Sequence, residues 1–203
     1  MPLGIPKEKP GSGKTYELCP AGTHAARCYS IVDFGSHLNT FDIEKTSFDH
    51  HVCFTWELDV PMADGRPFVI SEWRKFRIPK TGWNEKSKLC QALSSWLGGI
   101  KELPSFKDLV GKTGMVTVNH NKNQAGDKTF ANFASIVPLP GKLPAPDATN
   151  EPVYYELDMG FGDAFLALPE WQQNIIKDSR EYKKANPESS STSAPDDDMG
   201  IPF

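Results

Sequence analysis

The 203-residue chain lacks any apolar run of the roughly 18 residues that a membrane-spanning helix needs. Its first segment, MPLGIPKEKPGSGKTYE, has no apolar stretch after its lysines and therefore does not have the form of a secretory signal. We expect a flexible basic arm over residues 1–15. Together these absences predict a protein of the cytoplasm that has no membrane partner.

Cysteine is scarce, and its spacing contains no CxxC pair. In a chain without a secretory signal, the pattern predicts free thiols in a reducing compartment. His50-His51 lies near Cys53, but a closed zinc site needs four well-placed ligands, which usually come in paired spacings. The sequence therefore predicts no bound metal and no other cofactor. The four cysteines are Cys19, Cys28, Cys53 and Cys90.

Recognisable catalytic motifs are also missing. PGSGKT resembles part of a phosphate-binding loop, but Glu8 stands where that loop needs glycine, and a predicted strand follows instead of a helix. Asp33-Phe34-Gly35 matches a kinase magnesium motif without any of the kinase context. His24, His37 and His120 have no serine or cysteine partner at a known spacing. We therefore expect that the protein is not an enzyme, although a nuclease with dispersed catalytic residues would escape this test.

The charge of the chain is divided between its two parts. Hydrophobic residues make up 38% and charged residues 24%, which suits one domain with appendages. The net charge of −4 combines +3 through Asp147, from 18 basic and 15 acidic residues, with −7 from Ala148 onward, from 4 basic and 11 acidic residues. A mildly basic body with an acidic tail favours a polyanion binder whose tail lies outside the binding groove.

The first part of the body is predicted to form strands. In HVCFTWELDV, Val52, Phe54, Trp56 and Leu58 alternate with smaller or polar residues, so they are expected to face a core. Asp64-Gly65 is typical of a hairpin turn. The expected elements are strands over Thr23–Phe34, His51–Val60 and Pro67–Ile78, with a loop over Gly35–Asp49 between the first two.

A helix and a second hairpin are predicted next. In NEKSKLCQALSSWLGG, Asn84 is a candidate N-cap and Gly98-Gly99 ends the helix. Strands over Gly114–Asn123 and Lys128–Leu139 follow a short helix or turn at SFKDLVGK. Three strands, a helix and two strands are the layout of an OB-fold, a five-stranded Greek-key barrel, which we assign to residues 16–140. An SH3-like barrel or a small sandwich stays open. The predicted apolar stripe of the helix is Leu89, Leu93, Trp96 and Leu97.

Beyond the barrel, the sequence predicts an extension over residues 141–185. A Pro-rich linker comes first, and VYYELD then adds a strand or packs on the barrel. LPEWQQNIIKDSREYKKA reads as one C-terminal helix with a partial apolar stripe at Trp171, Ile175 and Tyr182. Residues 186–203 are Ser/Pro-rich and acidic, and we expect a disordered acidic tail there.

One segment, EWRKFRIPKTGW, combines aromatic and basic residues as single-strand binding requires. By alternation, Trp73, Lys75 and Arg77 share one strand face, whereas Arg74 and Phe76 face the core. In the alternative interpretation Trp73 fills the core and the cations form an ordinary solvated surface. The other candidate contacts, from the following loop, the first two strands and the second hairpin, are Arg27, Tyr29, Thr55, Lys80, Trp83, His120, Lys122, Lys128 and Phe130.

The last eight residues, DDDMGIPF, combine an acidic cluster with an apolar tip that carries the terminal carboxylate. An apolar pocket with a basic rim would hold such a tip. The alternative is a tail that only solubilises the protein. The candidate partner-binding residues are Asp196, Asp197, Asp198, Ile201, Pro202 and Phe203.

This tip resembles the C-terminal tip of bacterial single-stranded DNA-binding proteins, from which it departs at Met199-Gly200. The body is similar to phage-encoded single-stranded DNA-binding proteins across most of Tyr16–Tyr182, in YELCPAGTHAARCYSIVDFG, NEKSKLCQALSSW and LPEWQQNIIKDSREY. The resemblance implies a protein that coats single-stranded DNA during replication, recombination or repair and recruits partner enzymes through its tip, in the host cytoplasm if phage-encoded. An adaptor that binds no DNA is the main alternative. RNA or duplex binding, homo-oligomerisation and site size stay open.

Overall fold

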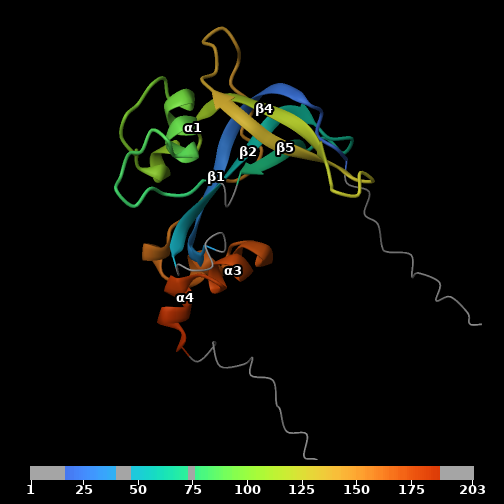
Figure 1. Cartoon of the computed structure of the whole chain (residues 1–203). Helices are drawn as coiled ribbons and strands as arrows, with labels where there is room; N and C mark the ends of the chain where they lie inside the picture. The colour runs from blue at the N-terminus through green and yellow to red at the C-terminus, as the bar shows by residue number, and fades with distance from the viewer. Residues whose placement is uncertain (1–16, 40–46, 73–75, 188–203) are drawn as a thin grey trace, which may run out of the picture.

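The longest strand, β1 (Gly22–Leu38), organises the fold, because the five other strands are placed on it directly or through one neighbour. The computed structural model describes residues 17–39, 47–72 and 76–187. In Figure 1, β1 runs from the barrel down to a group of helices formed by the C-terminal part of the chain. The other strands are β2 (Phe48–Pro61), β3 (Pro67–Glu72), β4 (Thr113–Lys122), β5 (Thr129–Val137) and β6 (Val153–Tyr155).

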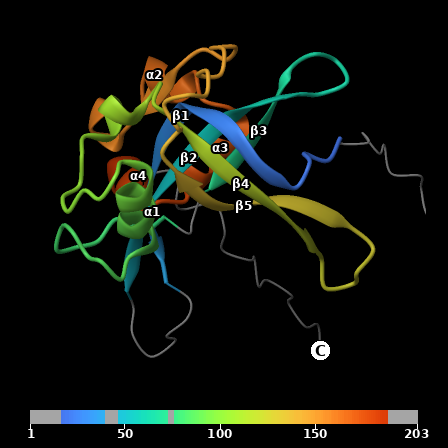
Figure 2. The same ribbon diagram turned by 90° about the horizontal axis from the view of Figure 1, so that it is seen from above.

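Strands β1 to β5 form a nearly closed antiparallel barrel. They are hydrogen-bonded in the order β3-β2-β1-β4-β5, and β3 comes into contact with β5 across the remaining gap. Figure 2, seen from above, shows the strands wrapping around one another in this way. Helix α1 (Lys88–Trp96) lies between the third and fourth strands of the sequence, so the predicted OB-fold layout is confirmed.

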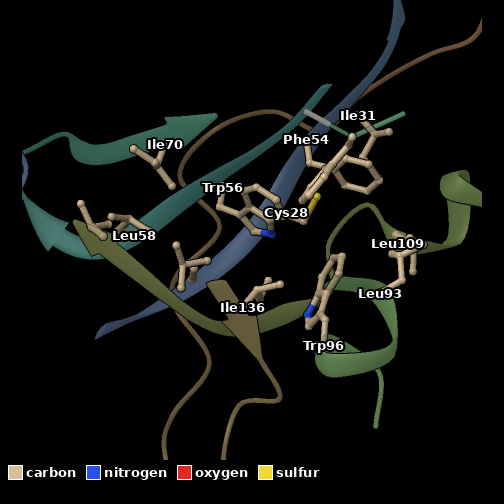
Figure 3. Close-up of a cluster of buried hydrophobic side chains, with 14 of the residues drawn as sticks. Cys28, Ile31, Phe54, Trp56, Leu58, Ile70, Leu93, Trp96, Leu109 and Ile136 are labelled. Carbon is tan, nitrogen blue, oxygen red and sulfur yellow. The ribbon is translucent and has the colours of Figure 1, made fainter. Parts of the chain in front are cut away.

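The barrel core follows the alternation of β2. Val52, Phe54, Trp56 and Leu58 are all buried, as predicted. Trp56 stacks on Phe133 of β5 with ring centroids 4.8 Å apart. Figure 3 shows these side chains meeting residues of α1 in one cluster. Aromatic rings packed in this way bury the largest apolar area that a side chain can supply, which explains why the barrel closes around them.

Helix α1 closes one side of the barrel, but it begins later than predicted. Its N-cap is Ser87, whereas the Asn84 side chain accepts a hydrogen bond from the Lys86 amide (2.9 Å) in the turn before the helix. The predicted stripe is buried at Leu89, Leu93 and Trp96, and Leu97 is half-buried. Trp96 passes so close to Gly114 that a Cβ there would lie 2.8 Å from Trp96 Nε1, and this packing therefore requires glycine.

The predicted strand ends also need correction. The expected loop over Gly35–Asp49 is shorter, because β1 continues to Leu38 and β2 begins at Phe48. The third strand was expected to reach Ile78, but β3 ends at Glu72, and residues 73–75 lie outside the described part. Pairing with β2 resumes at Arg77, which bridges His51.

The second half of β1 and the start of β2 extend past the barrel and carry a C-terminal unit. Strand β6 pairs in parallel with β1, so of the two possibilities left open for VYYELD the segment adds a strand. The single helix predicted near the C-terminus is two helices, because Ser179 caps the second one by accepting from the Tyr182 amide. The helical elements outside the barrel are η1 (Phe106–Leu109), η2 (Leu157–Met159), α2 (Asp163–Leu166), α3 (Glu170–Lys177) and α4 (Arg180–Ala185).

This unit has its own apolar cluster, separate from that of the barrel. Phe34 of β1 and Cys53 of β2 meet Tyr155, Phe165 and Ile176. The stripe predicted for the last helix is only partly right, because the fully buried position of α3 is Ile176, while Trp171 is 46% exposed and packs edge-on against Phe34. The chain thus has two apolar clusters joined by one pair of strands.

Candidate nucleic-acid interface

An open groove of about 1090 Å³ lies where the barrel meets the C-terminal unit. Its cationic side chains are Arg77, Lys80 and Lys88, of which the first two were predicted as nucleic-acid contacts. Leu38 adds an exposed apolar surface. The other residues lining the groove are His37, Asn39, Asp49, His51, Ile78, Pro79, Asn84, Ser87 and Asp178.

Five separate parts of the chain build this groove. The end of β1 and the start of β2 supply one wall, the segment after β3 supplies the cations Arg77 and Lys80, and the first turn of α1 adds Lys88. Asp178, which follows α3, comes from the C-terminal unit. Backbone hydrogen bonds fix the cationic segment to β2: the Ile78 amide donates to the His50 carbonyl (2.9 Å), and the Val52 amide donates to the Phe76 carbonyl (3.2 Å). Arg77 is therefore held at the edge of the sheet, while Lys80 lies in the following turn and Lys88 on α1.

The groove has the chemical character that a single strand requires. Arg77 is 45% exposed and pairs with Asp49 at 3.3 Å (Nη1 to Oδ2), so its guanidinium lies at the groove surface beside an acidic neighbour. The rings of His37 and His51 lie edge-to-face with centroids 5.6 Å apart. His51 is buried and His37 is half-buried, so the groove offers its cations to phosphates, and offers Leu38 and part of the His37 ring to bases.

Two of the strongest predicted residues, Trp73 and Lys75, lie outside the described residues. The same holds for the six tip residues Asp196, Asp197, Asp198, Ile201, Pro202 and Phe203. Phe76 is buried with Phe68 and Ile70, which confirms the predicted inward face of the EWRKFRIPKTGW segment.

Three predicted contacts on the first two strands are not on an exposed face. Arg27 is buried in an ion pair with Glu57, and its Nη2 donates to the Asn150 carbonyl (2.6 Å). Thr55 is buried and bonded to Ser71 (Oγ1 to Oγ, 2.9 Å), and Tyr29 is half-buried. Around Arg27 the cause is the segment before β6, which covers it: Asn150 bonds to Arg27, and the Thr149 and Asn150 amides bond to its partner Glu57. These three positions were predicted as contacts because alternation alone does not reveal this burial.

This buried network shifts the acidity of its carboxylate. Burial alone would raise the pKa of Glu57, but hydrogen bonds from Arg27 and Asn150 outweigh it and hold that pKa below its usual value. Asn150 donates to Glu57 Oε2 through both its amide (2.8 Å) and its side chain (2.7 Å). The network therefore has a structural role, fastening the covering segment to the barrel.

The β4–β5 hairpin holds the other predicted cations at the opposite end of β1. Gly22 pairs with Val118 there, whereas Leu38 borders the groove, so roughly 50 Å of strand separates the two ends. Lys122 and Lys128 are exposed, and Phe130 is 50% exposed. His120 is held by a hydrogen bond to the Cys19 carbonyl (2.7 Å). The structure thus splits the predicted contacts into a groove set and a hairpin set.

Trp83 belongs to neither set. It is half-buried and lines a separate hollow of about 360 Å³ beside α1, with Cys90, Gln91 and Lys101. Its direct neighbour Asn84 lines the groove, whereas Trp83 lines this other hollow. Sequence order alone placed Trp83 together with Lys80.

Asp33, Ser36 and His50 form a constellation that the sequence did not reveal. His50 Nε2 lies 2.6 Å from Asp33 Oδ1, and its Nδ1 lies 3.2 Å from Ser36 Oγ. A serine, a histidine and an aspartate bonded in this order could carry out acyl transfer, but that chemistry also needs free backbone amides that stabilise an oxyanion. Here the Gly35 amide donates to Asp33 and the Ser36 amide to Glu181 (both 2.8 Å), so the amides beside the serine are taken. The arrangement suits a structural junction better than a hydrolytic site.

The charges around His50 shift its pKa upward. Burial lowers that pKa, but the hydrogen bond to Asp33 and the negative charges of Asp33 and Glu181 raise it by more. In turn, the bonds from Ser36 and the charge of His50 lower the pKa of Glu181 despite its burial. The junction therefore favours a protonated histidine between two carboxylates.

Several groove residues could not be found from the sequence. His37 and Asp178 meet at the groove from distant parts of the chain, and no spacing signals that meeting. Lys88 was not among the predicted contacts, because a single lysine in a predicted helix carries no binding signal. Only the basic run around Arg77 carried a local signal.

No protein-family model matches the chain, and no curated protein matches it either. Within residues 17–39, 47–72 and 76–187, no three His, Cys, Asp or Glu side chains are grouped so that they could hold a metal ion. In the same part of the chain, no helix is both long and apolar enough to cross a bilayer.

Proposed function

We propose that the protein binds single-stranded DNA, with little sequence preference, in the groove lined by Arg77, Lys80 and Lys88. The observation that carries this proposal is the groove itself: three cations beside the exposed Leu38 and the half-buried ring of His37, next to an OB-fold barrel. OB-folds use such faces for oligonucleotides. In this proposal the protein coats single strands in replication, recombination or repair, and the DDDMGIPF tip recruits partner enzymes.

The proposed mechanism is electrostatic first and apolar second. Each cation that contacts a phosphate releases counterions, so affinity falls as salt rises, with a slope of about −0.7 per contact for single strands. Three groove cations thus predict a slope of about −2 or steeper. The acidic tip would be repelled by DNA, so its removal is expected to spare or strengthen DNA binding while recruitment is lost.

A fluorescence titration with oligo-dT at several salt concentrations tests the proposal. The double substitution Arg77→Ala/Lys80→Ala is expected to weaken binding and to make the salt slope less steep by about 1.4. Lys107→Ala, a cation of η1 that does not line the groove, is the matched control and should leave the slope unchanged.

Absence of binding at low salt would refute DNA binding and favour the alternative of an adaptor. In that case the tip partners would bind the Arg77→Ala/Lys80→Ala variant as well as the wild type. An affinity indifferent to salt would also contradict the proposal, because no counterions would then be released.

A further inference from the structure

Helix α4 contacts β1 more closely than any side chain at position 35 would allow. Gly35 has φ +79°, next to an irregularity in the pairing of β1 with β2. A Cβ on Gly35 would lie 2.8 Å from the Ser179 Cβ and 2.9 Å from Glu181 Oε2. The left-handed backbone and the lack of a side chain together allow the first turn of α4 to reach the strand.

Glu181 makes the central bond of this junction. Its Oε2 accepts a hydrogen bond from the Ser36 amide (2.8 Å), and its charge faces the His50–Asp33 pair. Beside it, the Arg180 guanidinium lies 5.0 Å from the centre of the Phe48 ring at the start of β2. Two adjacent residues of α4 therefore contact the two strands that extend past the barrel, Glu181 the end of β1 and Arg180 the start of β2. We call this part of the pair, residues 35–38 with residues 48–51, the β1–β2 stem.

The same stem carries one wall of the groove. The His50 carbonyl accepts from the Ile78 amide, and Asp49 pairs with Arg77. Asp178, directly before the Ser179 cap, lines the groove from the other side. A shift of α4 would therefore move the stem, and the stem would move the cationic segment.

From these contacts we infer that Glu181 is a positioning residue for single-strand binding: through the Ser36 amide it clamps the β1–β2 stem so that Arg77 and its neighbours keep the geometry of the groove. The inference rests on the proposed function. It also makes a counterintuitive prediction about sign. Charge alone predicts that removing an acidic residue near the groove strengthens binding to a polyanion, whereas loss of the clamp weakens it.

The test compares two carboxylates that each lie in the first turn of a C-terminal helix, Glu181 of α4 and the exposed Glu170 of α3. Oligo-dT affinity is measured across salt concentrations for Glu181→Ala and Glu170→Ala. We expect Glu181→Ala to bind about fivefold more weakly with an unchanged salt slope, because no phosphate contact is lost. Glu170→Ala should bind as the wild type or slightly more tightly. Glu181→Gln keeps an acceptor oxygen and should recover most of the affinity.

A second measurement, the backbone amide resonance of Ser36, tests the contact with Glu181 independently of DNA binding. The Ser36 amide resonance should move strongly in Glu181→Ala, weakly in Glu181→Gln and not at all in Glu170→Ala. If the wild type binds no oligo-dT, the proposed function fails, and these resonances still decide whether the clamp exists. If the wild type binds and Glu181→Ala binds equally well or more tightly, the inference is wrong and the proposed function stands.

Discussion

The two halves of the β1–β2 pair differ in how they are stabilised. In the barrel, the pair packs on one large aromatic cluster that includes Phe54 and Trp56. Beyond the barrel, the same strands depend on a smaller cluster around Phe165 and on polar bonds to α4. The proposed DNA groove lies beside the second half. The difference indicates that the barrel half of the pair rests on aromatic packing, whereas the other half depends more on polar contacts with α4.

The largest expected effect is the loss of stability when a side chain of the barrel core is removed. Trp56 is 1% exposed and stacks on Phe133, so Trp56→Ala should cost about 3–5 kcal/mol of unfolding free energy. Because the C-terminal unit rests on strands held by the barrel, we expect hydrogen-exchange protection to fall in both halves. Chemical denaturation and exchange measure the two quantities. If the C-terminal unit kept its hydrogen-exchange protection in Trp56→Ala, its stability would not depend on the barrel.

A smaller and more local effect is expected from Phe165→Ala. Phe165 is 2% exposed and contacts the rings of Tyr155, Phe161 and Tyr182. Its loss should destabilise the C-terminal unit by about 3 kcal/mol or more. Amide exchange should accelerate in α3 and α4 while the amides of β4 and β5 stay protected. Equal loss of protection in β4 would show that the two halves unfold as one cooperative unit.

The smallest predicted effect is a pH dependence of stability that arises where β1 and β2 meet the C-terminal unit. Since the pKa of His50 is raised in the folded state, the stabilisation from its charge is complete below about pH 6.5, its unfolded value. This stabilisation is lost as the pH rises through the pKa that His50 has in the folded state. Asp33→Asn removes the main charged partner of His50.

The thermal midpoints of the wild type and Asp33→Asn should therefore differ more at pH 6 than at pH 8.5. Groups that titrate equally in both chains cancel in this comparison. A difference that is the same at both values would mean that the histidine is neutral throughout, and the junction would then depend on hydrogen bonds alone.

The barrel could be predicted from the sequence because its signals are local. Alternation around Trp56 gave the inward face of β2, and Gly98-Gly99 marked the end of α1. The extension could not be predicted in detail, because Ser179 breaks the last helix and Gly35 receives α4 only once the chain is folded. Likewise, Arg27 was expected to be accessible because nothing near it in the sequence reveals its buried partner Glu57.

The candidate contacts show the same division. The basic run around Arg77 is a local pattern, and it does border the groove. Lys122 belongs to a similar local pattern but lies at the far end of β1. A pattern identifies the type of residue that binds DNA, whereas only the fold decides which of those residues share one surface.

The most direct test of the groove is a hydrogen-exchange footprint of the wild type with and without bound oligo-dT. The account predicts increased protection in residues 76–88 and in the β1–β2 stem, with little change at the tip of the β4–β5 hairpin. Protection confined to the hairpin around Lys122 and Lys128, with none in the groove, would contradict it.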